Sequence, residues 1–181
     1  VGEYFLPVLG LMINTIVISV LLILVSYFVG MKLIGDIGIT PEALTKGMES
    51  FTAMKAFLGG LTQEQMFKLN AWNMLLFFTM SVTYFLIMFY SPALFLKEKN
   101  PFKAYFASLK DLFSKKFFTN FGLFLILFIS YFILSIFTTL FGTNVIMHFV
   151  FTLINFYYLV FVAVMVYNYY YKNFVKLDKT I

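Results

Sequence analysis

The chain has 181 residues, of which 62% are hydrophobic and only 12% are charged, and its formal net charge is +5. This composition, with a mean hydropathy of +0.93, excludes an ordinary soluble domain, in which about 25% of residues are charged. The absence of cysteine excludes a disulfide framework, a thiolate nucleophile and a cysteine-ligated metal.

Three long segments without Asp, Glu, Lys or Arg predict membrane-spanning helices. Segments 4–31 and 69–96 each contain 28 residues, enough for one tilted span. Segment 117–171 contains 55 residues, and one helix of that length would reach about 80 Å, against a hydrocarbon core of about 30 Å. It must therefore fold back. Gly142 and Asn144 tolerate the positive φ angles that end a helix, so the turn is predicted at 141–144, between spans 117–140 and 145–171.

These segments predict an all-α integral membrane helical bundle, in which residues 1–181 form a single domain with four transmembrane helices and two interfacial amphipathic helices. The first span is too long for a typical signal peptide and lacks a basic segment before it, so we expect it to be retained. Because residue 1 is Val rather than Met, we expect processing or a missing N-terminal piece, which leaves room for further spans upstream.

The linker at 35–68 is predicted to be helical and amphipathic. Thr40-Pro41 is a typical helix start, an N-cap followed by Pro at the first helical position. Apolar residues then recur at spacings of three and four until Gly59-Gly60 ends the pattern, namely Leu44, Met48, Phe51, Met54 and Leu58. This helix is either a cap over the span ends, or a lid or partner-docking helix.

Two local signals bracket the second span. Thr62 and Gln65 have the spacing of a capping box, which predicts a helix start that leads into the span. Ser91-Pro92 predicts a break near its end, because Pro lacks the backbone N–H and clashes with the preceding turn. The break is either a simple helix exit or a gate.

A second amphipathic helix is predicted at 100–114, where Asn100-Pro101 repeats the N-cap and Pro start. Its apolar residues fall at helical spacing, with Lys103, Lys110 and Asp111 on the remaining arc. We predict that it contacts the membrane surface or a partner protein, and that each lysine contributes about 1 kcal/mol against anionic headgroups. The predicted contact residues are Phe102, Lys103, Tyr105, Phe106, Leu109, Lys110 and Phe113.

The distribution of lysine predicts the orientation. Segment 97–116 holds six Lys against two acidic residues, and the tail after Tyr171 holds three Lys against one. The linker at 32–68 balances four Lys with four acidic residues. Because basic segments stay on the cytoplasmic side, both termini are predicted inside and the linker outside.

Polar residues inside the spans are few. His148, Thr152 and Asn155 share one face of the fourth span at i, i+4 and i+7, a predicted polar seam that carries a proton or holds a polar headgroup. The other interpretation is that His148 lies at the interface, because it follows the predicted turn closely. No span contains Asp, Glu or Lys at depth, which argues against a proton-coupled pump, a voltage sensor or a site for a charged substrate.

Catalytic motifs are missing from the sequence. With one His and no Cys there is no zinc motif, and there is no G-x-S-x-G, P-loop or Gly-rich dinucleotide turn. Asp36, Asp111 and Asp178 are isolated and lie outside the spans. We therefore expect no enzymatic activity and no cofactor or metal. We also expect no nucleic-acid binding, because the positive-inside rule already explains the lysines.

One part of the sequence resembles a recurring bacterial membrane module, in which a Pro-Ala span exit leads through a charged turn to an amphipathic helix and a new span. It comprises residues 91–104, Ser108-Leu109-Lys110 and Lys115-Lys116-Phe117. The resemblance is to the multi-span membrane domain found with some bacterial glycerophosphodiester phosphodiesterases and related uncharacterised membrane proteins. It implies a multi-span α-helical domain without catalytic residues of its own.

The leading hypothesis is a non-catalytic multi-pass protein of the bacterial plasma membrane, a lipid-interacting or complex-forming component. Its expected partners are lipids with anionic headgroups, other membrane proteins or a second copy of the chain. The alternative hypothesis is a transporter or channel subunit for a small neutral solute or a proton. Its pathway would be lined by Thr15, Ser19, Thr79, Thr83, His148 and Asn155.

Overall fold

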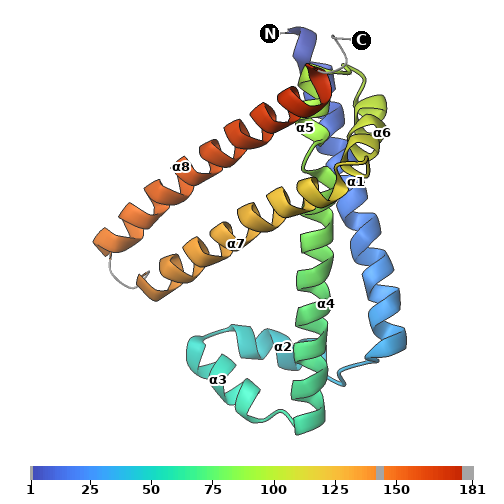
Figure 1. The fold of residues 1–181 in the computed structure, drawn as a ribbon. Helices are drawn as coiled ribbons and strands as arrows, with labels where there is room; N and C mark the ends of the chain where they lie inside the picture. The colour runs from blue at the N-terminus through green and yellow to red at the C-terminus, as the bar shows by residue number, and fades with distance from the viewer. Residues whose placement is uncertain (1, 142–144, 177–181) are drawn as a thin grey trace. The chain divides into compact units, whose positions relative to one another are not determined.

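A computed structural model describes residues 2–141 and 145–176, and every regular element among them is a helix (Figure 1). The predicted all-α fold is thus confirmed. The predicted turn residues Gly142 and Asn144 lie outside the described residues. The elements are α1 (Gly2–Leu33), α2 (Pro41–Met48), α3 (Phe51–Gly59), α4 (Gln63–Ile87), α5 (Tyr90–Leu96), α6 (Pro101–Leu112), α7 (Phe117–Phe141), α8 (Val145–Tyr170) and η1, a π-helical turn (Tyr171–Val175).

Four helical segments are long and apolar enough to cross a membrane, namely Phe5–Leu33, Gln63–Leu96, Phe117–Phe141 and Val145–Val175. They correspond to the four predicted spans, the second of which begins six residues earlier than predicted, at 63 rather than 69. In the most apolar stretch of each span only 6% to 28% of the residues are buried. Such exposure of apolar side chains is expected where lipid, rather than protein, covers a helix.

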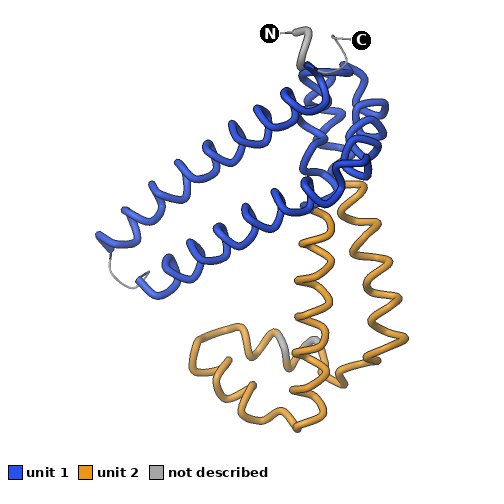
Figure 2. The backbone as a smooth tube through the Cα atoms, in the orientation of Figure 1, with its two compact units in different colours: residues 1–15, 84–181 blue, residues 16–83 orange. Residues whose placement is uncertain are grey.

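The chain forms two compact units, one of residues 1–15 with 84–181 and one of residues 16–83 (Figure 2). The core of the first unit gathers where α5 and α6 meet the start of α7, the end of α8 and η1. Its fully buried side chains include Phe89, Tyr90, Leu94, Leu112 and Tyr170. The single membrane domain over 1–181 stays a prediction.

The start of α1 packs on the core of this first unit. Asn14 is buried and donates from its side-chain amide to the hydroxyl of Tyr90 at 2.9 Å. Gly10 lies against Pro101 so closely that a Cβ at this glycine would stand 2.4 Å from the Pro101 Cγ. The absence of a side chain at Gly10 therefore lets α1 reach the first turn of α6.

In the second unit, α1 pairs with α4 through polar and aromatic contacts. The hydroxyl groups of Ser26 and Thr79 are 2.6 Å apart. The indole N–H of Trp72 donates to the carbonyl oxygen of Gly35 at 3.1 Å. Gly30 contacts the Trp72 ring, and a Cβ there would lie 2.3 Å from it. The two helices thus pair through small residues and hydroxyl groups, as helices in lipid commonly do.

The linker at 35–68 is helical, as predicted, but it divides into two helices. Thr40 caps α2 by accepting from the Ala43 N–H, and Ser50 caps α3 by accepting from the Ala53 N–H at 3.0 Å. The apolar spacing across 41–58 predicts one continuous helix, but the side chain of Ser50 competes for the backbone and starts a new one. The capping box at α4 is confirmed, because Thr62 and Gln65 bond each other's backbone N–H groups at 3.1 and 3.2 Å.

The break in the second span falls before Pro92, between α4 and α5. Residues 88–89 form a turn, and Pro92 then occupies the first turn of α5, where it is buried. A proline at this place has no N–H to bond the carbonyl of Met88, and the first turn of a helix needs no such bond. The span therefore continues past the break to Leu96 rather than ending at the proline.

Candidate functional site

A buried polar cluster joins α5, α6 and the end of α8. Asp111 is only 8% exposed, and its Oδ2 accepts a hydrogen bond from the Tyr170 hydroxyl at 2.6 Å. The same oxygen lies 3.3 Å from the Lys97 Nζ. Because a buried carboxylate is costly unless it is paired and hydrogen-bonded, these two partners allow Asp111 to stay inside the fold.

Asn120 extends this cluster into α7. It is fully buried, and its amide nitrogen donates to the carbonyl oxygens of Asp111 at 3.1 Å and Leu112 at 2.9 Å. These carbonyls belong to the last turn of α6, where the regular donors four residues further on are lost. The Asn120 Oδ1 accepts from the Tyr169 hydroxyl at 2.8 Å. One side chain thus ends α6 and fastens it to α7 and α8.

A third contact ties the start of α7 to η1. The Lys116 Nζ donates to the Asn173 Oδ1 at 2.8 Å and lies 5.7 Å from the centre of the Phe174 ring. Among the described residues, every buried side-chain nitrogen or oxygen atom has a hydrogen-bond partner. No group of three His, Asp or Glu side chains that could hold a metal occurs in the described part of the chain. We infer that this cluster positions α6.

The sequence pattern places Asp111 on the polar arc of the amphipathic helix, whereas the structure buries it. The only sequence signal for the buried arc is a row of small residues, Ala104 and Ser108, one turn apart and followed by Leu112. All three are fully buried. Such a row allows α6 to approach its neighbours closely.

The seven predicted contact residues of α6 and its end separate into two groups. Phe102, Phe106 and Phe113 are 66%, 67% and 56% exposed, and Lys103 and Lys110 are also exposed. Because they recur at helical spacing, the three phenylalanines form one stripe, and the two lysines lie beside it. We name these five residues the α6 stripe.

The other two predicted residues turn toward the protein. Tyr105 is half-buried, and its ring meets that of Tyr90 edge to face with centroids 5.4 Å apart. Burial raises the pKa of the Tyr105 hydroxyl, so it stays neutral. Leu109 is half-buried next to the stripe. The α6 stripe is therefore narrower than the sequence predicts.

The predicted seam on α8 does not form an enclosed site. His148 and Thr152 are exposed, and the Thr152 hydroxyl donates back to the His148 carbonyl oxygen at 2.8 Å. Only Asn155 turns toward α7, where its amide donates to the Thr138 hydroxyl at 3.0 Å. The structure thus uses Asn155 to pair the hairpin helices. A functional role for the three residues stays a prediction.

Two of the pathway residues of the alternative hypothesis also make local bonds. Thr79 and Thr83 are buried, and each hydroxyl donates to the carbonyl oxygen four residues earlier in α4, at 2.8 Å. Such back-bonding satisfies a hydroxyl inside an apolar helix without any ligand. These bonds do not indicate a pathway.

The comparisons with known proteins return no match. No family model, no curated protein and no solved structure matches this chain. The resemblance to the membrane domain of glycerophosphodiester phosphodiesterases stays a prediction.

Proposed function

We propose that the chain is a non-catalytic multi-pass protein of the bacterial plasma membrane that binds anionic lipid headgroups through the α6 stripe. Four helices long and apolar enough to cross a membrane support the membrane setting. The observation that carries the lipid contact is the pairing of three exposed phenylalanines with two exposed lysines on one short helix and its C-cap residue.

The chemistry of the stripe matches the boundary between acyl chains and headgroups. Phe102, Phe106 and Phe113 offer apolar rings to the acyl boundary, while Lys103 and Lys110 offer charge to phosphate groups. All 13 basic residues of the chain are lysine, so this contact is made by point charges and not by guanidinium forks. It therefore favours anionic lipids as a class over one headgroup of defined shape.

The polar cluster supports this orientation of α6. The bonds of Asp111 and Asn120 hold the opposite arc of the helix against the core, which leaves the stripe facing outward. Because α6 is already held in place, its phenylalanine rings contact lipid without a further loss of the conformational freedom of the helix. We infer that the buried cluster holds α6 in the orientation in which the α6 stripe contacts lipid.

A reporter on α6 tests the proposal. The chain has no native cysteine, so Ala107→Cys accepts a single environment-sensitive fluorophore beside the stripe. In vesicles of phosphatidylcholine with phosphatidylglycerol, we expect stronger quenching by lipids brominated near the headgroup than in phosphatidylcholine alone. Lys103→Glu with Lys110→Glu should abolish this difference.

The matched control is Lys46→Glu with Lys55→Glu, which makes the same change in charge at two exposed positions of the linker at 35–68. It should leave the difference intact. If the α6 reporter responds equally in both vesicle compositions, or if the two double variants behave alike, the proposed contact with anionic lipid is wrong.

A further inference from the structure

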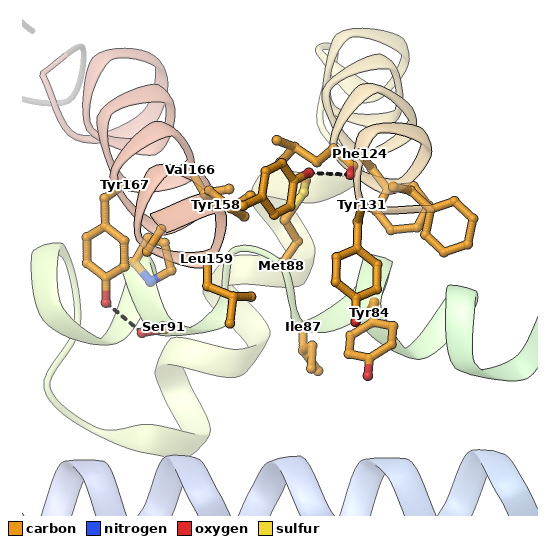
Figure 3. Close-up of a pocket in the computed structure, with 15 residues that line it drawn as sticks. Tyr84, Ile87, Met88, Ser91, Phe124, Tyr131, Tyr158, Leu159, Val166 and Tyr167 are labelled. Carbon is orange, nitrogen blue, oxygen red and sulfur yellow. Dashed lines mark hydrogen bonds between the residues drawn. The ribbon is translucent and has the colours of Figure 1, made fainter. Parts of the chain in front are cut away.

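An apolar cleft lies in the first unit, between α7, α8 and the region of the break between α4 and α5 (Figure 3). Its volume is about 520 Å³, within the range of roughly 300–1,000 Å³ that is typical of small-molecule sites. The proposed contact at the α6 stripe makes no use of it.

The walls of the cleft are apolar. Met88 contributes from the break and Pro92 from α5. Phe124 and Leu127 contribute from α7, and Val162 and Val166 from α8. No Asp, Glu, Lys, Arg or His side chain is among the described residues that line it. A ligand that fits these walls is uncharged where it touches them.

Three of the hydroxyl groups at the cleft bond other protein groups. The Ser91 and Tyr167 hydroxyls are 2.5 Å apart, and the Tyr158 hydroxyl donates to the Leu127 carbonyl oxygen at 2.7 Å (Figure 3). Because these bonds are internal, these three hydroxyl groups do not require a polar ligand. The cleft therefore offers chiefly hydrocarbon contact.

The position of the cleft indicates its occupant. Every lining residue belongs to the segments Gln63–Leu96, Phe117–Phe141 or Val145–Val175, which are long and apolar enough to cross a membrane. In that layer the abundant molecules are acyl chains, and an unfilled cleft would forfeit dispersion contacts along its walls. A helix of a second copy fits poorly. An α-helix is a cylinder about 10 Å wide, so the cleft would hold only about one turn of it.

We propose that this cleft binds one acyl chain of a membrane phospholipid. The proposal rests on the proposed membrane insertion but not on the contact of the α6 stripe with headgroups. An acyl chain held by three spans is sheltered on more sides than a chain that lies against a single helix. It should therefore stay with the protein when detergent strips the surrounding lipid.

Native mass spectrometry tests this inference. The full chain is reconstituted in vesicles of phosphatidylcholine, extracted in mild detergent and measured for retained lipid. We expect one retained phospholipid per chain. Ala163→Phe adds a ring inside the cleft and should lower this retention about tenfold, which corresponds to about 1.4 kcal/mol of binding free energy.

The matched control is Val164→Phe, which adds a ring at the next residue of α8, a position 63% exposed and outside the cleft lining. It should retain lipid like the unaltered chain. Leu159→Trp, at a lining position 59% exposed, is a second filling variant should Ala163→Phe not fold. Helical content by circular dichroism confirms that each variant folds.

Three outcomes overturn the inference. The first is that the unaltered chain retains no phospholipid. The second is that the filling variants retain as much lipid as Val164→Phe. The third is that the chain forms a dimer whose contact takes the place of the lipid. Because phosphatidylcholine has no net charge, Lys103→Glu with Lys110→Glu should not change this retention. Loss of lipid in that double variant but not in Ala163→Phe would place the retained lipid at the α6 stripe and overturn the cleft.

Discussion

Asp111 of α6 and Tyr170 of α8 are joined by a hydrogen bond of 2.6 Å across 59 residues of chain. The bond closes a loop that contains the whole α7–α8 hairpin. It sets the inner arc of α6 against the end of α8, and the opposite arc therefore carries the exposed stripe.

Tyr170→Phe tests the energetic weight of this bond. The change removes only the hydroxyl and leaves the nearly buried Asp111 carboxylate with one partner fewer. Because hydrogen bonds to charged groups contribute about 1.5–3 kcal/mol, we expect the free energy of unfolding to fall by about that amount. Thermal unfolding in detergent, followed by circular dichroism, measures the change.

The control for this variant is Tyr157→Phe, which removes a hydroxyl from a residue of α8 that is 71% exposed. Its unfolding midpoint should stay at that of the unaltered chain. Equal midpoints for the two variants would show that the Asp111 bond does not stabilise the fold.

Gly30→Ala should destabilise the pairing of α1 with α4. The added Cβ would lie 2.3 Å from the Trp72 ring, closer than side-chain atoms approach one another, so the ring or the helices must shift. Because Trp72 is the only tryptophan of the chain, its fluorescence emission reports on this contact directly. We expect a shifted emission maximum and a lower unfolding midpoint.

Gly122→Ala is the matched control in α7, because a Cβ there meets no atom within 4 Å. Alanine favours the helix by about 1 kcal/mol over glycine, so this variant should unfold at an equal or higher temperature. A Gly30→Ala variant as stable as Gly122→Ala would contradict the close packing of α1 on α4.

Single cysteines test the predicted orientation. Ser50→Cys, at an exposed position between α2 and α3, should react with an impermeant maleimide added outside cells. Ala107→Cys on α6 should react only after the membrane is opened. Ser108 is unsuitable as the inner reporter, because it is fully buried. Labelling of both cysteines from outside would reject the predicted topology.

His148→Ala tests the alternative hypothesis of a transport pathway. His148 is exposed and its predicted partner Thr152 bonds the backbone, so we expect proton and solute flux in proteoliposomes to be unchanged. Asn155→Leu, which removes the bond to Thr138, is the companion variant for the hairpin contact. A clear fall in flux with His148→Ala would favour the transport hypothesis.

Several local features could be predicted from sequence because their causes are local. The uncharged runs give the spans, since burying charge in hydrocarbon is costly. Thr40, Asn100 and the pair Thr62 and Gln65 cap helices as predicted, because each cap bonds the backbone within three residues. The helix start at Ser50 is of the same kind, but the apolar periodicity across it favours a single helix.

The sequence by itself determined that this chain is helical, with four segments fit to cross a membrane and an amphipathic helix near the basic segment. Only the tertiary structure decided that Asp111 is buried and which arc of α6 is left exposed. It also decided that α7 and α8 form walls of an apolar cleft. The physical reason is distance along the chain. The partners of Asp111 and the walls of the cleft come from helices that are far apart in sequence. Periodicity within one helix does not specify which of its faces a distant helix will cover.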